Sequence, residues 1–210
     1  MGLIYLIRHA STEWNEKQLW QGVVDTELSI NGINQAEGIA KYFLDNDIKV
    51  DLIFSSPMKR ALQTAQIIAS NIKFPIEEIK TDPRLRECEI VLWNGKNFDE
   101  IKRDCFDEFL VWQNNLHSSV KGAESLGDVQ KRMSDFFQEN IVHFANKNVI
   151  IVSHAISLRM FIAKILNVVP PDHLNYSLDN ASISAVEYFN NKLRIKFLNF
   201  TKLLNSTKRT

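Results

Sequence analysis

The sequence has few cysteines, no net charge and no long apolar run. Its 210 residues include only two cysteines, Cys88 and Cys105, too few for a disulfide framework or a zinc ligand set. Basic and acidic residues number 25 each, so no overall field would draw nucleic acid or an anionic membrane to the molecule. No apolar stretch approaches the roughly 20 residues that span a bilayer, and Arg8 interrupts the N-terminal apolar run too early for a secretory signal. These absences favour a cytoplasmic protein without nucleic-acid or membrane partners.

Apolar strand candidates alternate with amphipathic helix candidates along most of the chain. Strands are expected at 3–7, 52–54 and 149–152, more weakly at 76–80, and as a hairpin at 183–189 and 193–200. Helices are expected after Ser29, from Pro57, over about 97–115, from Ser125 with Asp128 to about Ala145, and over 157–166. This order predicts an α/β fold, a three-layer α/β/α sandwich with a mainly parallel sheet and one antiparallel edge region.

We expect a single domain over 1–210, a length that can bury one substantial core. The stretch at about 92–122 is helical but outside the strand-helix alternation, which indicates an insertion near the active-site edge of the sheet. Residues 201–210 are expected to be a loose tail. Five aromatic residues of the insertion are expected to form a small satellite core: Trp93, Phe98, Phe106, Phe109 and Trp112.

Basic side chains follow two of the predicted strands. The first strand ends in Arg8-His9, and the strand at 149–152 is followed by Ser153-His154. The carboxyl ends of parallel strands line one edge of an open sheet, where α/β proteins bind ligands. Arg60 lies in the first turn of a helix that begins at the same edge, so its guanidinium and the free N–H groups of the helix would face the same space. The sequence therefore predicts a cationic site for a phosphate or a carboxylate.

Such a site suits phosphoryl transfer. A neutral His9 imidazole can attack phosphorus, and neighbouring cations would lower its pKa and keep it unprotonated. Glu87 is the carboxyl best placed to protonate the leaving alkoxide, with Glu89 and Glu13 as nearby alternatives. Taken singly, each residue has an ordinary structural explanation, such as an ion pair or a solvated helix position. Three other histidines fit no ligand spacing and are expected at the surface: His117, His143 and His173.

Residues 8–15, Arg-His-Ala-Ser-Thr-Glu-Trp-Asn, resemble the RHG-E/Q-T-x-W-N signature of the histidine phosphatase superfamily, which has the phosphoglycerate-mutase-like fold. Further similar segments follow in the family's order: Gln21-Gly22 with Asp25, Leu28 and Gly32; Ser55-Ser56-Pro57 with Arg60-Ala61 and Thr64-Ala65; Leu85-Arg86-Glu87 with Trp93 and Gly95; Gly122 with Glu124-Ser125; and Val152-Ser153-His154. Six segments in order cover almost the whole chain. The chain is most similar to the short phosphatase branch, which includes broad-specificity and α-ribazole phosphatases.

The resemblance implies a role for each matching residue. His9 would be the nucleophile that becomes phosphohistidine, and Glu87 the proton donor and later the base. The phosphoryl oxygens would be held by Arg8, Arg60 and His154. The pocket for phosphate and substrate would also include Asn15, Gln21, Gly22 and Ala155. The resemblance implies no metal and no cofactor, because the cations of the site take the place of a metal ion.

Two departures from the family pattern lie directly after the catalytic histidines. Ala10 and Ala155 stand where the family usually has glycine. An alanine held at positive φ would strain the loop by about 1 kcal/mol, whereas at negative φ its methyl group would only crowd the site. Val91-Leu92 also replaces the usual residues before Trp93.

The sequence predicts metal-independent hydrolysis of a small phosphomonoester. One alternative is a phosphoglycerate mutase, although mutases of the family are usually longer. Another is a binding module that holds phosphorylated ligands without turnover, suggested by Ala10 and Ala155. The identity of the small phosphorylated substrate, and whether the chain is a monomer or a homodimer, stay open at this level.

Overall fold

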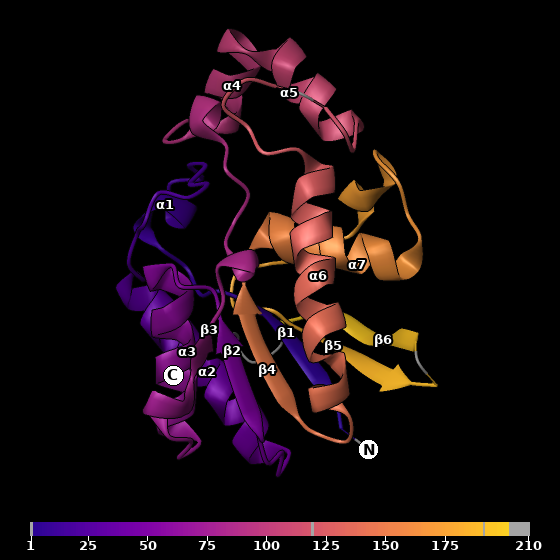
Figure 1. Cartoon of the computed structure of the whole chain (residues 1–210). Coiled ribbons are helices and arrows are strands. Elements are labelled where there is room, and N and C mark those ends of the chain that lie inside the picture. Colours follow the sequence, from indigo (N-terminus) through magenta and orange to yellow (C-terminus); the bar gives the residue numbers. More distant parts are fainter. Residues whose placement is uncertain (1, 119, 191, 202–210) are drawn as a thin grey trace.

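The computed structural model describes residues 2–118, 120–190 and 192–201, which form a six-stranded sheet with helices on both faces (Figure 1). The strands are β1 (Ile4–Arg8), β2 (Leu52–Ser55), β3 (Lys80–Thr81), β4 (Val149–Ser153), β5 (Ile183–Phe189) and β6 (Lys192–Phe200). Their order is β3-β2-β4-β1-β5-β6. The first four run parallel, β5 is antiparallel to β1, and β6 is antiparallel to β5. The predicted three-layer fold with one antiparallel edge is confirmed.

The helices are α1 (Glu13–Glu16), α2 (Ile30–Asp45), α3 (Lys59–Asn71), α4 (Phe98–Asp104), α5 (Phe106–Asn114), α6 (Leu126–Phe144) and α7 (Ala155–Leu166). Short 3-10 helices are η1 (Ile76–Glu78), η2 (Pro83–Leu85), η3 (Val91–Trp93) and η4 (Asp172–Asn175). Helices α2 and α3 cover one face of the sheet, and α6 and α7 cover the other (Figure 1). No helix in the described part of the chain is long and apolar enough to cross a membrane.

The alternation of side chains along each strand divides the core into two layers. On β1, Tyr5 and Ile7 pack in the layer beneath α2 and α3, whereas Ile4 and Leu6 pack in the layer beneath α6 and α7. Successive side chains of a strand point to opposite faces of the sheet, so a strand covered on both faces must be apolar throughout. This is why 3–7 and 149–152 are unbroken apolar runs.

Element boundaries differ from the sequence predictions at several points. The helix expected to open at Pro57 begins at Lys59, because Met58 is extended and its N–H donates to the Ser56 hydroxyl in a turn before the helix. Residues 76–78 form η1, and only Lys80–Thr81 pairs with β2. The stretch at 97–115 forms two helices that break at Cys105, and the helix expected from 157 already begins at Ala155.

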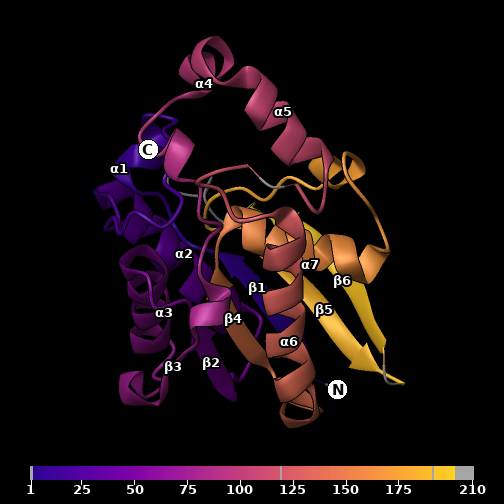
Figure 2. The same cartoon turned by 45° about the horizontal axis from the view of Figure 1, so that its top comes forward.

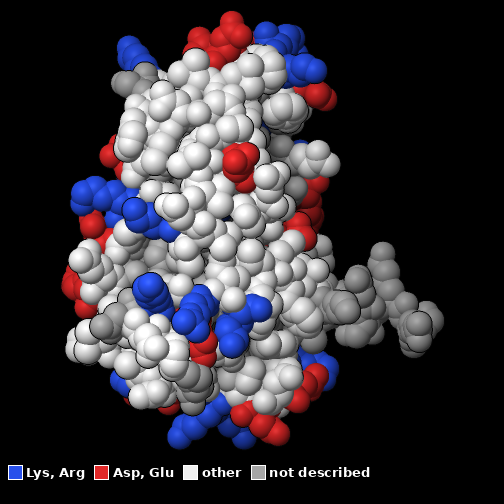
Figure 3. All heavy atoms as spheres, turned by 90° about the vertical axis from the view of Figure 1, so that its right-hand side faces the viewer, with Lys and Arg blue, Asp and Glu red and all other residues white. Residues whose placement is uncertain are grey.

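The outer strand β6 carries an exposed basic row. Lys192, Arg194 and Lys196 alternate along it and are exposed, and Lys196 pairs with Glu187 of β5 at 3.6 Å. Figure 3 views the side that lies to the right in Figure 1, where Lys and Arg side chains gather. Charged side chains on an edge strand discourage pairing with a strand of another molecule. Most of the predicted tail, from residue 202 onward, lies outside the described residues.

The insertion places α4 and α5 over one end of the sheet, as Figures 1 and 2 both show. Trp93, Phe109 and Trp112 are buried together and Phe106 packs against them, which confirms the predicted satellite core. Phe98 lies at its rim, 48% exposed, with its ring 5.7 Å from that of Phe109. The same cluster includes residues of α6 and α7, so the insertion is packed onto the body of the domain.

One histidine that the sequence analysis expected at the surface is buried. His173 lies in η4 with its Nε2 3.1 Å from the carbonyl oxygen of Gln113 in α5. This contact joins segments 60 residues apart, so no local pattern could reveal it. His117 and His143 are exposed, as predicted.

The start of α2 lies against the loop that follows β1. The Ser29 hydroxyl accepts a hydrogen bond from the Gly32 N–H, and the Ser29 N–H donates to the carbonyl of Ser11. A Cβ atom at Gly32 would lie 1.9 Å from that carbonyl oxygen, a distance that requires the backbone to move. Gly32 therefore permits the close approach of helix and loop.

We predict that Gly32→Ala lowers the free energy of unfolding by about 1–3 kcal/mol, the usual cost of overpacking. Urea denaturation would measure it. Gly38→Ala is the matched control, because Gly38 is a half-buried residue in the middle of the same helix. There, alanine is expected to stabilise by about 0.5–1 kcal/mol, since glycine is the poorer helix former. Equal effects of the two substitutions would contradict the proposed close approach.

Candidate functional site

A cavity of about 310 Å³ opens where β1, β2 and β4 end, the edge at which parallel sheets bind ligands. Its wall is formed by segments from the whole length of the chain. The lining residues are Arg8, His9, Asn15, Gln18, Leu19, Trp20, Gln21, Gly22, Arg60, Glu87, Ile90, Ala155, Ile156, Arg159 and Asn180.

His9 follows β1 and is held by both its backbone and its ring. Its N–H donates to the carbonyl of Ser153 at the end of β4, over 2.9 Å. The ring Nδ1 lies 2.8 Å from the carbonyl oxygen of Ala10, so Nδ1 carries the proton and donates it. The other ring nitrogen, Nε2, lies 3.3 Å from Nε of Arg60, which donates to it. Nε2 is therefore the unprotonated nitrogen, and its electron pair accepts the hydrogen bond from Arg60.

Both histidines of the site are held in the neutral form. Burial, followed by the charges of Arg60 and Arg8, lowers the pKa of His9 well below its ordinary value of 6.5. Burial and then Arg60 likewise lower the pKa of His154. The direction expected for His9 is confirmed, but loss of hydration is a larger cause than the neighbouring cations.

Two arginines surround His9. Arg60, in the first turn of α3, is 1% exposed, and its two terminal nitrogens donate to the carbonyls of Val24 and Gly22, each at 2.8 Å. Burial lowers the pKa of Arg60 to about 10, against the opposing charge of Glu87. Arg8 donates to the carbonyl of Leu178 at 2.6 Å. The guanidinium groups are thus oriented by backbone oxygens.

His154 occupies the position before the first turn of α7, with its ring 5.0 Å from that of His9. Its Nε2 lies 2.8 Å from the hydroxyl of Ser56, which also accepts the N–H of Met58. In the tautomer in which Ser56 donates to Nε2, the proton of His154 is on Nδ1. Within the described part of the chain, this Nδ1 and Nε of Arg8 are buried without hydrogen-bond partners. Unsatisfied buried donors are costly, so both are suited to the oxygens of a bound anion.

Glu87 follows η2 and reaches the N-terminus of α7. It is 7% exposed, and its carboxylate accepts the backbone N–H groups of Cys88 at 2.9 Å and Ser157 at 3.2 Å. The first N–H groups of a helix have no partner within the helix and favour a carboxylate. The two alternatives, Glu13 and Glu89, are exposed and do not line the cavity. The described residues contain no group of three or more His, Cys, Asp or Glu side chains that could hold a metal ion.

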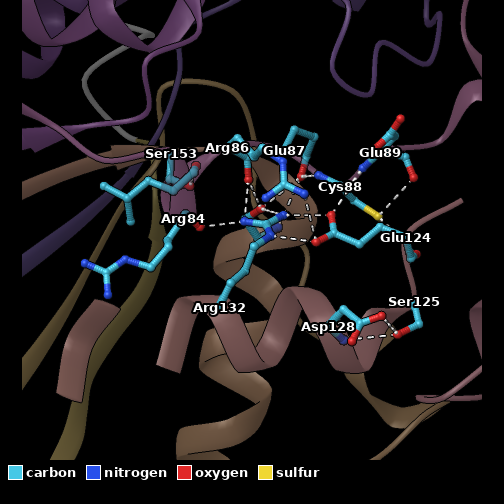
Figure 4. A network of polar contacts seen from close by, with 12 residues as sticks. Arg84, Arg86, Glu87, Cys88, Glu89, Glu124, Ser125, Asp128, Arg132 and Ser153 are labelled. Atoms are coloured by element: carbon cyan, nitrogen blue, oxygen red, sulfur yellow. Dashed lines mark hydrogen bonds and ion pairs between the residues drawn. The ribbon is translucent and has the colours of Figure 1, made fainter. Parts of the chain in front are cut away.

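An ion pair between Arg132 of α6 and Glu124, which precedes that helix, supports the loop that carries Glu87 (Figure 4). Arg132 donates to both carboxylate oxygens of Glu124, at 2.8 and 3.1 Å, and the two side chains are only 10% and 11% exposed. The remaining terminal nitrogen of Arg132 donates to the carbonyls of Arg84 and Arg86, at 2.6 and 2.7 Å. A bidentate pair of this kind fixes the orientation of both side chains and is stronger than a single neutral hydrogen bond. The residues that precede Glu87 are therefore anchored to α6.

Asn15 is in the short helix α1, at the third position after its N-cap Thr12. Its amide oxygen accepts from the backbone N–H of Thr12 and from Nδ2 of Asn180 at 3.2 Å. Asn180 also donates to the carbonyl of His9 at 3.1 Å. These bonds leave the NH2 group of Asn15 as its donor toward the cavity.

Gln21 and Gly22 line the cavity from the loop after α1. Gly22 has φ +49°, and a Cβ atom there would lie 2.5 Å from the side chain of Ile90. Only glycine adopts this conformation without strain and leaves room for the opposite wall.

Both alanines that replace glycine have negative φ, so neither strains its loop. Ala10 is fully buried in the core beneath α2 and α3, while Ala155 begins α7 and lines the cavity. Among the residues that do have positive φ, Ala181 at +58° contacts this loop, because its N–H donates to the carbonyl of His9.

All site residues named from the sequence meet at this edge of the sheet. Sequence reasoning missed Arg159, Asn180, Ser56 and Arg132. Arg159 had a usable signal, because residues four apart on a helix share a face and Arg159 is four residues after Ala155. The other three act through contacts distant in sequence, which have no local pattern.

Comparison with known proteins places the chain among phosphoryl-transfer enzymes. The family model described as histidine phosphatase superfamily (branch 1) matches residues 4–201. The chain is 32% identical to phosphoserine phosphatase 1 of Hydrogenobacter thermophilus over 199 residues, 94% of this chain and 92% of that protein. It is 29% identical to a 2,3-bisphosphoglycerate-dependent phosphoglycerate mutase of Rhizobium rhizogenes over 164 residues, 77% of this chain and 78% of the other.

A solved structure shares the whole fold. The crystal structure of a phosphoserine phosphatase mutant from Entamoeba histolytica in complex with phosphoserine has a TM-score of 0.84 and 27% identity, covering 97% of this chain and all of that one. The ordered segments, the fold and the family match agree, and the chain belongs to the histidine phosphatase superfamily.

Proposed function

We propose that this protein hydrolyses a small phosphomonoester without a metal ion, through a phosphohistidine intermediate on His9. The observation that carries the proposal is the state of His9, whose Nδ1 proton is donated to Ala10 while Nε2 keeps its electron pair beside Arg60. A neutral imidazole held among cations is a nucleophile matched to an anionic phosphoryl group.

In the first half of the reaction, Nε2 of His9 attacks phosphorus and the bond from phosphorus to the ester oxygen breaks. Arg8, Arg60 and His154 donate hydrogen bonds to the three equatorial oxygens, where the charge of the loose transition state is spread. Glu87 gives its proton to the leaving oxygen, so the alcohol departs neutral. Asn15, Gln21, Gly22 and Ala155 form the remaining wall around the phosphoryl group and its ester.

In the second half, water attacks the phosphohistidine. The Glu87 carboxylate accepts a proton from that water as the new phosphorus–oxygen bond forms and the bond to Nε2 breaks. Inorganic phosphate leaves, and His9 and Glu87 return to their starting protonation states. One carboxyl thus acts first as an acid and then as a base.

The relatives support a phosphatase more than a mutase. The phosphoserine phosphatase named above is 32% identical to this chain, whereas the mutase named above is 29% identical. The mutase stays the second candidate, because it differs only in passing the phosphoryl group to a hydroxyl instead of water. The site is compatible with both acceptors.

We predict that rapid quenching during turnover of radiolabelled p-nitrophenyl phosphate traps an acid-labile phosphoprotein. His9→Ala should abolish both the trapped label and turnover, because no other group takes the place of Nε2. His143→Ala is the control, since His143 is exposed on α6. Label that persists in His9→Ala would show a different nucleophile, and no turnover across a panel of phosphomonoesters would refute the hydrolase.

The same preparation separates hydrolase from mutase by its products. With 3-phosphoglycerate and 2,3-bisphosphoglycerate present, hydrolysis releases inorganic phosphate. Accumulation of 2-phosphoglycerate without phosphate release would instead support the mutase.

We predict that Glu87→Gln slows hydrolysis of alkyl phosphates by about 100- to 10,000-fold, the usual contribution of a general acid. Hydrolysis of p-nitrophenyl phosphate should fall much less in the first step, because nitrophenolate leaves without a proton. Burst-phase kinetics with the two substrates would measure the difference. Glu89→Gln is the control, since Glu89 is exposed nearby. Equal losses with both leaving groups would argue against Glu87 as the acid.

A further inference from the structure

Arg159 is a further cation in the wall of the cavity, and it has no assigned role in the reaction above. It lies on α7, one turn after Ala155, and both residues line the cavity. Its Nε is shielded from solvent and has no hydrogen-bond partner, and the described residues offer the side chain no ion pair. Buried charges are normally paired, because an unpaired one loses its hydration without compensation. Arg159 is half-buried, and its buried Nε beside the cavity is suited to bind an anionic group of a ligand.

The phosphoryl group does not fill this role. Its oxygens have donors in Arg8, Arg60 and His154, which cluster around His9. Arg159 lines the cavity together with Arg8 and Glu87, and its helix α7 also contacts η4. Burial lowers the pKa of His173 in η4, and the charge of Arg159 contributes to that shift. An anion at Arg159 would belong to another part of the bound molecule.

Glu87, the acidic residue whose charge opposes the effect of burial on the pKa of Arg159, already has hydrogen-bond partners. The carboxylate of Glu87 accepts backbone N–H groups at the start of α7 and lies beyond ion-pair distance from Arg159. Burial lowers the pKa of Arg159, and Glu87 opposes that effect without contacting the guanidinium. The free Nε and terminal nitrogens of Arg159 still form a planar fork of donors, which matches a carboxylate.

We propose that Arg159 binds a carboxylate of the substrate, so that the substrate class is a phosphomonoester of a small carboxylic acid. This inference rests on the proposed function, because it assigns the second recognition point of the same cavity. A single guanidinium suits a singly charged carboxylate, whereas the phosphoryl position is surrounded by two arginines and two histidines. The cavity of about 310 Å³ has room for two anionic groups joined by a short carbon skeleton.

Two ligands that differ only in the carboxylate test the proposal. O-phosphoserine and O-phosphoethanolamine would be titrated calorimetrically into the full chain carrying His9→Ala, which prevents turnover. We expect phosphoserine to bind roughly 10- to 100-fold more tightly, the range of a charge-assisted hydrogen bond. Adding Arg159→Met should bring the ratio of the two dissociation constants close to one, and Arg159→Lys should keep part of it. Because the ratio comes from one preparation, it does not depend on the folded fraction.

Lys164→Met is the matched control, since Lys164 is an exposed cation of the same helix and does not line this cavity. It should leave the ratio unchanged. Equal affinity for both ligands before the Arg159 substitution, or a ratio that survives Arg159→Met, would overturn the proposal. Because binding needs no turnover, an Arg159-dependent ratio in a protein that hydrolyses neither ligand would contradict the proposed function alone.

Discussion

Two arginines and two histidines share a buried space at the end of the sheet, and the surrounding structure offsets that concentration of positive charge. Backbone carbonyls orient the guanidinium groups of Arg8 and Arg60. The imidazoles of His9 and His154 stay neutral, because burial and the arginines lower their pKa values. A phosphoryl group bound as we propose would offset the charges of Arg8 and Arg60. Burial and the same two charges lower the pKa of His9 and leave the electron pair of its Nε2 unprotonated.

The loop that carries Glu87 is also held in place by contacts with other parts of the fold. That loop has little regular structure of its own, and it is held by the residues that follow the insertion. Backbone bonds join Val91 to Gly122 and Glu89 to Glu124, while Arg132 fixes the preceding carbonyls. The aromatic core of α4 and α5 is packed onto α6 and α7, and it supports the segment that runs from α5 back to α6. The insertion therefore belongs to the catalytic edge and determines where Glu87 lies.

Much of this arrangement was readable from the sequence, because it depends on local rules. Arg8-His9 and Ser153-His154 follow strands whose carboxyl ends line one edge of a parallel sheet. The family segments, which follow in the expected order, predicted the other residues of the site. The parts that were missed depend on tertiary contacts. Of the two alternatives stated for Ala10, the structure shows the one without backbone strain, whereas Ala181, whose positive φ no sequence pattern indicated, donates to the carbonyl of His9 from a loop 172 residues away. The unpaired state of Arg159 likewise depends on distant neighbours.

The central claim is that His9 is a neutral imidazole with its proton on Nδ1 and an unprotonated Nε2 beside Arg60. Nitrogen-15 NMR of the histidine rings, with His9 assigned by its loss in His9→Gln, measures this directly. As the pH falls through 6.5, His9 should remain neutral, because burial, Arg60 and Arg8 place its pKa well below that value. Nδ1 should be the protonated nitrogen throughout. An imidazolium form of His9 at pH 6.5, or a proton on Nε2 of the neutral ring, would contradict the account.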